Sequence, residues 1–462
     1  MEVTGRSWLT LLIASVVGFM VSLEITVIAL ALPEIRAAFP STPESTLSWI
    51  ITAYSIGLAS LLLLAGWASD RYGHKRLFLV GLAVFAVASL LAGLASSIEV
   101  LIAARLVQSV GGAMQFPSGL ALLLAAFPLE RRQLAIGVWG AMGGLAAAAG
   151  PPLGGFLVGV FGWRSVFLIN VPIAATAAVA GAFLLFESRP QFSPSRVDML
   201  SIPLGTIGVG LIVLGVVQGP EAGWLTVAGL APFAIGLAMI SLFVVRSSRH
   251  PSPLFDLALF ANRSYAIGNV GSVFFVVAFF AYFVPLPTFI QEAWGWSTLR
   301  TGLVVVPGPL VAALLSPVAG RFADRFGVAP ILTIGGSAGA VAMTLHLVLT
   351  GQEPNPVVGI IVPGLVLGVS AGCSFAMLVG ATMQDVPARR YGMAGAGRTT
   401  VFQLAIAVAI ALAVAIIGRP DGAADHLGAL RAVWSLALAL FLGQAILFGL
   451  VFPRSSPAVT SG

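Results

Sequence analysis

The residue with the clearest chemistry in this sequence is Glu24, a carboxylic acid inside an apolar stretch. The stretch from Trp8 to Leu32 is long enough to cross a bilayer, and Glu24 lies about 12 Å along a helix from its end. An acid at that depth costs roughly 2.5 kcal/mol or more, so it usually faces a cavity or a partner. We therefore predict a proton or cation site at Glu24. The alternative is a carboxylate that reaches up to the headgroups.

A second ionisable side chain, Arg105, lies in the fourth apolar stretch at a similar depth, about 9 Å from the same membrane surface. Buried charges in membrane spans usually pair, so we predict a Glu24–Arg105 pair. The helical face of Arg105 continues with Gln108, Gly112 and Gln115, which predicts the polar wall of a cavity. The alternative for Arg105 is contact with headgroups.

The elements that must position these charges are transmembrane helices. The chain has 462 residues, of which 58% are hydrophobic and only 9% are charged, whereas soluble domains carry about 25% charged residues. Apolar runs of about 20 residues give fourteen candidate spans, which puts both termini on one side of the membrane. The single cysteine, Cys373, excludes intrachain disulfides and Cys-cluster metal sites. We expect a retained first span, because it is too long for a cleaved signal peptide.

The placement of Lys and Arg predicts the orientation. With the N-terminus in the cytoplasm, the cytoplasmic segments hold about three times as many Lys and Arg as the outer loops. These residues are scattered singly or in pairs, so they indicate topology rather than nucleic-acid binding. We therefore predict a multi-pass protein with both termini in the cytoplasm. The Arg-rich, Lys-poor composition favours a bacterial inner membrane.

One short sequence occurs twice. Residues 66–73 and 320–327 both read G-x-x-x-D-R-aromatic-G, and each follows the second span of a six-span set, in a predicted cytoplasmic loop. This repeat predicts an all-α integral membrane protein with two six-helix bundles and a substrate path between them. The predicted divisions are an N-terminal bundle (1–187), a linker with two extra helices at 199–245 (188–263) and a C-terminal bundle (264–462).

Several motifs together resemble the major facilitator superfamily. They are the stretch from Gly66 to Arg76, the fourth span around Arg105, the sequence Gly150-Pro151-Pro152-Leu153-Gly154-Gly155, and the stretch from Trp163 to Pro172. With the first-span sequence from Leu23 to Pro33, the chain is similar to the fourteen-span drug/proton antiporter branch. That branch usually has Asp and Asn where this chain has Glu24 and Ala29. The resemblance implies the major facilitator fold and proton-driven drug export.

The resemblance also implies roles in gating. It implies that Asp70 and Arg71, and their second copies Asp324 and Arg325, latch the two halves in one gating state. The alternative is a solvated charge in a turn. The other conformational residues that it implies are Gly73, Gly150, Pro151, Gly154 and Gly155.

The C-terminal half offers an aromatic face and a few polar residues. Phe275, Phe279 and Tyr282 share one face of the ninth span, which suits apolar or cationic ligands. The alternative is packing against lipid or neighbouring helices. In the thirteenth span we predict Gln403 in the substrate cavity, while Arg398 could equally reach the headgroups.

These features together predict a proton-coupled antiporter that exports small amphipathic or cationic compounds, and hence multidrug efflux and antibiotic resistance. One alternative is an exporter of an anionic metabolite or lipid-like molecule, bound by Arg105 or Arg398. Another is a non-transporting membrane receptor. An enzyme is not expected, because there is no P-loop and no catalytic constellation at one depth. We expect a monomer with a small-molecule substrate, protons and membrane lipid as partners, and no cofactor, metal or nucleic acid.

Overall fold

The computed structural model describes residues 4–42, 44–187, 198, 200–223, 226–250, 255–296, 298–387, 390–417 and 423–453. Within these ranges every regular element is a helix, which confirms the predicted all-α class. Eleven helices there are long and apolar enough to cross a membrane, and shorter apolar helices lie at Gly5–Met20 and Ser201–Gly215. The count of fourteen spans stays a prediction.

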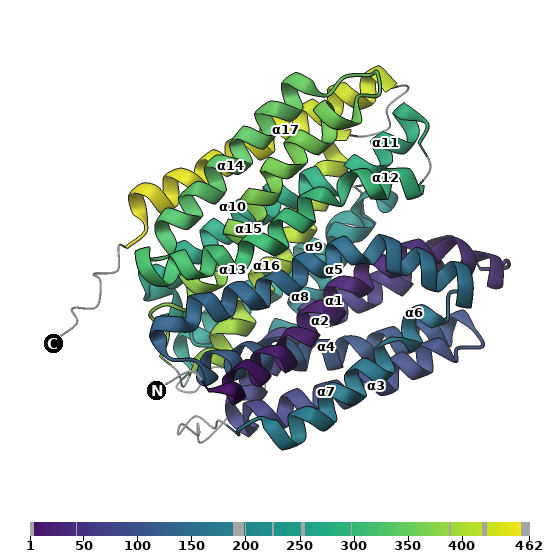
Figure 1. Ribbon diagram of the computed structural model, residues 1–462. Helices are drawn as coiled ribbons and strands as arrows, with labels where there is room; N and C mark the ends of the chain where they lie inside the picture. The colour runs from purple at the N-terminus through teal and green to yellow at the C-terminus, as the bar shows by residue number, and fades with distance from the viewer. Residues whose placement is uncertain are drawn as a thin grey trace. The chain divides into compact units, whose positions relative to one another are not determined.

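Contacts divide the chain into two compact units. The first consists of Met1–Pro128, Ala149–Ala258 and Val386–Leu404. Its complete helices are α1 (Gly5–Ala38), α2 (Glu44–Tyr72), α3 (His74–Gly93), α4 (Ile98–Ala126), α6 (Ser165–Leu168), α7 (Asn170–Leu184), α8 (Ser201–Ala222) and α9 (Val227–Arg249). It also holds the later part of α5 (Arg132–Phe161) and the first part of α16 (Tyr391–Ile417). Helix α4 packs against α1, α2 and α3, and α8 packs against α9 and α2 (Figure 1).

The second unit consists of Leu129–Ala148, Leu259–Asp385 and Ala405–Gly462. Its helices are η1 (Leu129–Arg131), α10 (Arg263–Phe283), α11 (Leu286–Trp294), α12 (Thr298–Val305), α13 (Pro307–Phe326), α14 (Val328–Leu349), α15 (Val362–Met383), α17 (Ala423–Ile446) and the π-helical η3 (Val357–Ile361) and η5 (Leu447–Val451). The short helix η2 (Leu257–Ala261) joins the units along the chain. In this unit α15 packs against α10, α13 and α14. The predicted domain divisions stay predictions.

Glycine sets the short spacing between α3 and α4. A Cβ atom on Gly111 of α4 would lie 2.7 Å from the backbone nitrogen of Phe85 in α3, which is too close for any side chain. Small residues of this kind let membrane helices approach closely. Helix α4 begins where the Ser97 side chain accepts a hydrogen bond from the Val100 amide. Gln108 and Gln115 of α4 therefore lie close enough to α3 to bond to it.

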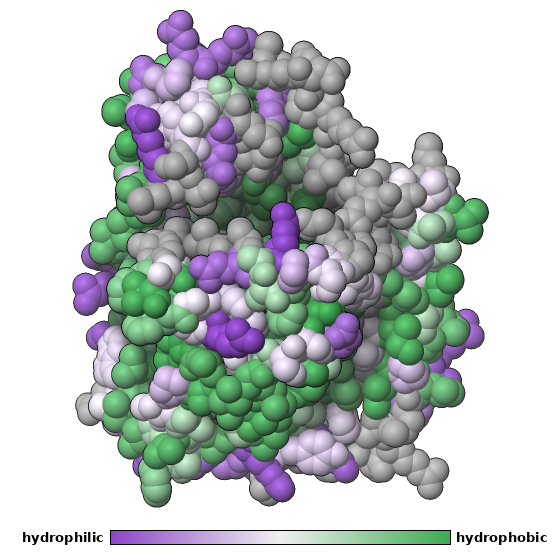
Figure 2. Space-filling view, turned by 90° about the vertical axis from the view of Figure 1, so that its right-hand side faces the viewer, coloured by the Kyte–Doolittle hydropathy of each residue, from purple (hydrophilic) through white to green (hydrophobic). Residues whose placement is uncertain are grey.

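Large apolar side chains also lie on the outside. Phe183 in α7 and Val227 in α9 are 80% and 85% exposed, and Leu450 in the second unit is 81% exposed. Figure 2 shows broad hydrophobic areas on one face, with hydrophilic residues gathered in smaller patches. Water disfavours such a surface and lipid tails favour it, so these faces fit a membrane-embedded protein.

Candidate functional site

Glu24 of α1 and Arg105 of α4 form a buried ion pair, as their matching depth predicts. Glu24 Oε1 lies 2.5 Å from Arg105 Nη1, and the two residues are only 3% and 1% exposed. Gln108, one turn further along α4, donates from Nε2 to the same Glu24 oxygen at 2.6 Å. Arg105 Nη1 also donates to Gln108 Oε1 at 2.6 Å. The three side chains therefore form a closed triangle of hydrogen bonds.

Helices α2 and α3 complete the surroundings of this triangle. Arg105 Nε donates to the Ile50 carbonyl at 2.9 Å, and the guanidinium carbon lies 4.3 Å from the ring centre of Tyr54. A cation over an aromatic face is attracted by the ring quadrupole. Gln108 Nε2 also donates to Ser89 Oγ of α3 at 2.9 Å. The network thus ties together four helices of the first unit.

The two oxygens of the Glu24 carboxylate differ. Oε1 accepts hydrogen bonds from Arg105 and Gln108, whereas buried Oε2 accepts none from the described residues. A proton can therefore bind at Oε2 while Oε1 keeps both of its bonds. Because a buried polar atom without a partner is costly, an open carboxylate oxygen of this kind is an expected feature of a functional site.

The polar face of α4 meets α2 at Arg105 and Gly112 and α3 at Gln108 and Gln115. Gln108 and Gln115 are both fully buried. Gln115 Nε2 donates to the Gly81 carbonyl of α3 at 2.9 Å. Helices α2 and α3 together cover this face. Gln108 therefore belongs to the charge network, and a substrate-lining role for Gln115 stays a prediction.

The repeated motif forms helix ends, whereas the sequence suggested loops. Helices α2 and α13 run on through the motif, so Asp70 and Asp324 lie in their last turns. Each helix is followed by a glycine with positive φ, 104° at Gly73 and 82° at Gly327. Glycine adopts this conformation without the steric penalty of other residues. The motif therefore specifies a helix end with an acid one turn before it.

In the first unit, Asp70 caps the start of α16. Its two carboxylate oxygens accept hydrogen bonds from the Gly392 amide at 2.9 Å and the Met393 amide at 2.7 Å. The first amides of a helix have no intrahelical partner, so an acid there is stabilising. A Cβ atom on Gly66 would lie 2.8 Å from the Gly392 carbonyl oxygen. The first glycine of the motif thus lets α2 approach α16 closely enough for Asp70 to reach it.

The second unit repeats this arrangement at the start of α5. Asp324 accepts hydrogen bonds from the Gln133 amide at 3.0 Å and the Leu134 amide at 3.1 Å. A Cβ atom on Gly320 would lie 2.5 Å from the Gln133 carbonyl oxygen. Both copies of the motif therefore use a glycine for close approach and an acid, four residues later, as a helix cap.

Three more of the predicted gating and cavity residues with described surroundings are Arg71, Arg325 and Gln403. Arg71 is half-buried, while Arg325 is exposed and lies over the ring of its neighbour Phe326 at 5.2 Å. Gln403 is half-buried in the part of α16 that belongs to the first unit.

The Gly-Pro-x-x-Gly-Gly sequence lies within α5, in the part that belongs to the first unit. Gly150 and Gly154 are buried there. The surroundings of Pro151 and Gly155 lie outside the described part of the chain. The predicted conformational role of this sequence stays a prediction.

The aromatic face of α10 packs within the second unit. Phe275 is buried, stacks on Phe279 with ring centres 5.7 Å apart, and meets Phe375 edge-on at 4.7 Å. Tyr282 instead lies against His346 of α14, with ring centres 4.8 Å apart. The structure thus brings Phe275 and Phe279 into one cluster and places Tyr282 beside a buried histidine.

Sequence reasoning missed Glu187, which follows α7. Its carboxylate accepts hydrogen bonds from the Lys75 and Arg76 amides at 3.1 and 3.2 Å, at the start of α3. That helix begins after Gly73, which has no side chain to cap it. The signal in the sequence that could have pointed to Glu187 is that α3 begins after a glycine, which has no side chain to cap the first amides. Among the described residues, no group of three His, Cys, Asp or Glu could hold a metal ion.

Comparisons with known proteins agree on one family. The Major Facilitator Superfamily matches residues 14–410 of this chain. The multidrug resistance protein Stp of Mycobacterium tuberculosis (strain CDC 1551 / Oshkosh) is 33% identical over 396 residues, which cover 84% of this chain and 72% of that protein. The tetracenomycin C resistance and export protein of Streptomyces glaucescens is 32% identical over 403 residues, covering 87% and 74%. The methylenomycin A resistance protein of Bacillus subtilis (strain 168) is 32% identical over 397 residues, covering 86% and 84%.

Two solved structures share the fold. The human organic anion transporter MFSD10 (TETRAN) superposes with a TM-score of 0.68 at 15% identity, over 96% of this chain and all of that one. The proton:xylose symporter XylE has the same TM-score at 14% identity, over 98% of each chain. At this identity the likeness extends to the fold alone.

Proposed function

This chain belongs to the major facilitator superfamily of membrane transporters, and we propose that it is a proton-coupled antiporter that exports small amphipathic or cationic compounds by alternating access. The observation that carries the proposal is the buried Glu24–Arg105–Gln108 network. An intramembrane acid is a typical proton site, and Glu24 is such an acid, paired with the Arg105 cation and with one carboxylate oxygen that accepts no hydrogen bond from the described residues. Further support comes from the relatives named for resistance and export.

Glu24 is the proposed proton carrier. In the proposed cycle, protonation at Oε2 removes the negative charge and leaves Arg105 as the unbalanced charge of the network. The two access states then differ in proton affinity, and only such a difference can shift their populations. Cargo favours the deprotonated state, and protonation favours release outside. One acid per network fits the exchange of one proton for a monovalent cation or a neutral molecule.

Anionic cargo has less support. Arg105 already donates from Nε to Ile50 and from Nη1 to Glu24 and Gln108, so two of its three nitrogens are engaged within the protein. Arg398 lies 5.5 Å from the Phe402 ring centre, in the cation–π range. Phe275 and Phe279 of α10, in contrast, are aromatic residues of the kind that suits apolar or cationic molecules, and Phe279 is partly exposed.

We propose fourteen spans of the drug/proton antiporter type, with α8 and α9 as the inserted hairpin. Both termini lie in the cytoplasm, and the membrane is a bacterial inner membrane. The support is the excess of Lys and Arg in the segments assigned to the cytoplasm, together with relatives from bacteria.

Reconstituted protein tests the proposed transport directly. In proteoliposomes with an imposed pH gradient, we expect a fluorescent monovalent cation to accumulate about tenfold per pH unit, because a pH unit is worth about 1.36 kcal/mol per proton. Without the gradient, the cation should equilibrate at equal concentrations. Accumulation driven by a sodium gradient instead, or transport of anionic dyes alone, would contradict the proposal.

The two helix caps are the proposed gating residues. Replacing Asp70 or Asp324 with Asn removes the negative charge at a helix start, where such a charge is worth about 0.3–1 kcal/mol. We therefore expect either change to alter the transport rate by up to about fivefold. The final accumulation per pH unit should not change, because gating does not alter the coupling.

Glu353→Gln provides the control, because Glu353 is an exposed acid between α14 and η3 and takes part in neither helix cap. Its transport rate should match that of the wild type. If Asp70→Asn lowers the final accumulation at a normal initial rate, Asp70 belongs to the coupling machinery and the gating assignment is wrong.

A further inference from the structure

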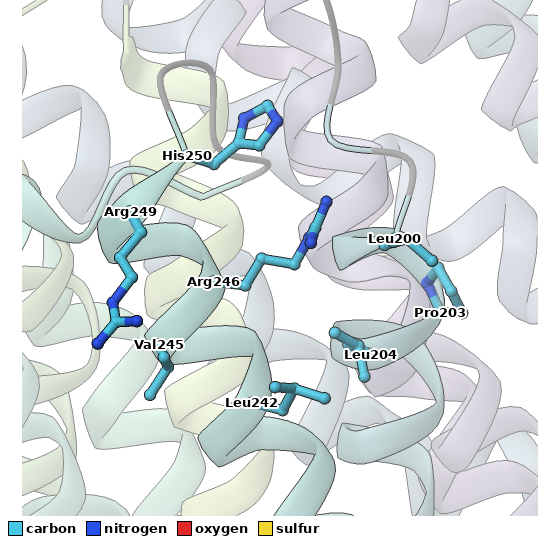
Figure 3. A pocket seen from close by; sticks show the side chains of 8 residues that line it. All are labelled: Leu200, Pro203, Leu204, Leu242, Val245, Arg246, Arg249 and His250. Carbon is cyan, nitrogen blue, oxygen red and sulfur yellow. The ribbon is translucent and has the colours of Figure 1, made fainter.

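A groove opens between the start of α8 and the end of α9. Its volume is about 490 Å³, and it is lined by Leu200, Pro203, Leu204, Leu242, Val245, Arg246, Arg249 and His250. Figure 3 shows Leu204 of α8 and Leu242 of α9 in the space between the two helices, with Arg246 extending toward α8 and Arg249 and His250 at the end of α9. The site is separate from the Glu24 network, and the proposed cycle does not use it.

The apolar part of the groove faces outward. Leu200, Leu242 and Val245 are 60%, 55% and 47% exposed. Five of the eight lining residues are apolar, which suits a hydrocarbon chain better than a soluble solute. Since α9 is one of the helices that can cross a membrane, this surface is accessible to lipid.

The described residues at the polar end of the groove carry one net positive charge, from an ion pair and one further arginine. Arg246 Nε lies 2.7 Å from Asp198 Oδ2, and Ser201 Oγ donates to the same carboxylate at 2.6 Å. Burial raises the pKa of Asp198, but the bonds from Ser201 and Arg246 outweigh that effect and hold the pKa below its usual value. The Arg246–Asp198 pair is therefore neutral as a whole. No ion pair with an acid among the described residues is found for exposed Arg249, which adds one positive charge.

We propose that this groove binds an anionic phospholipid of the surrounding leaflet, with its phosphodiester at Arg249 and Arg246 and an acyl chain between α8 and α9. A phosphodiester carries one negative charge, which matches the single positive charge of the site. Arginine forms bidentate hydrogen bonds to phosphate oxygens. Basic pockets beside membrane helices are suited to acidic lipid headgroups. The site would hold the α8–α9 pair to the leaflet at one membrane surface.

Photo-crosslinking in the full-length protein tests this proposal. The probe is phosphatidylglycerol with a diazirine on its acyl chain, in proteoliposomes of phosphatidylcholine, and the readout is the labelled peptide by mass spectrometry. We expect label on the α8 and α9 segments that line the groove. Unlabelled phosphatidylglycerol should compete, and extra phosphatidylcholine should not. Arg249→Gln should reduce this labelling about fivefold, the effect of one basic residue near a membrane surface.

Two further variants complete the test. Arg321→Gln changes an exposed arginine in the second unit and should leave the labelling unchanged. Leu242→Trp fills the apolar part of the groove and should reduce labelling without a change in charge. Arg246→Gln is avoided, because it would leave buried Asp198 unpaired. Equal labelling of Arg249→Gln and wild type, or equal competition by phosphatidylcholine, would overturn the proposal. So would competition by glycerophosphoglycerol at matched concentration, which would indicate a soluble-anion site.

Discussion

Replacing Glu24 with glutamine is expected to abolish uphill export. Glutamine keeps the size of the side chain and an oxygen that can accept from Arg105 and Gln108, but it cannot exchange a proton at the position of Oε2. The variant should therefore bind cargo and equilibrate it across the membrane without accumulating it. In proteoliposomes, the accumulation should fall from about tenfold per pH unit to no accumulation.

Two matched variants show whether the loss is specific. Glu24→Asp keeps the acid with a shorter reach, so it should retain coupling at a reduced rate. Glu99→Gln changes an exposed acid in the first turn of α4 and should behave as wild type. The proposed coupling role is wrong if Glu24→Gln accumulates the cation as well as the wild type does. Loss of both uphill and downhill transport would instead point to a folding defect, which the stability measurements below detect.

The pairing of Glu24 with Arg105 was predictable because depth depends on a single number, the rise per residue of a helix. Two opposite charges at one depth in an apolar medium have few alternatives to pairing. The repeat of Gly66 and Asp70 as Gly320 and Asp324 was equally visible. A motif that occurs in both halves of the sequence predicts the same local structure in each half, and both copies do form a helix end with an acid that caps another helix.

The partners of these residues were not predictable, because they depend on how each helix is rotated and which helices are neighbours. The spacing of Gln108 and Gln115 shows that they share a face, but it cannot show that this face meets α3. In the same way, Asp70 reaches an amide 322 residues away along the chain. Glu187 is similar, since only the fold places it beside the uncapped start of α3. Local periodicity carries no information on such contacts.

The second large effect concerns stability, because Glu24 and Arg105 are both nearly inaccessible to solvent. Removing one partner of a buried ion pair leaves the other charge uncompensated, at a cost of about 3–5 kcal/mol. Glu24→Gln and Arg105→Gln should therefore each lower the free energy of unfolding in detergent or bicelles by several kcal/mol. In the double variant no charge remains, and two amides can bond to each other. We expect the double variant to be more stable than either single variant.

The surface pair Arg390–Asp256 provides the reference for this cycle. Arg390 Nη2 lies 2.8 Å from Asp256 Oδ2, a distance similar to that in the buried pair, but the two side chains are 34% and 26% exposed. Solvent screens an exposed pair, so its coupling energy should be about 1 kcal/mol or less. The two ion pairs have similar distances but different burial. Comparing their coupling energies therefore separates the cost of leaving a buried charge unpaired from the attraction between the two charges. If the Glu24/Arg105 double variant is no more stable than the single variants, the two charges do not compensate each other, and Arg105 cannot be the cation that balances the proposed proton site.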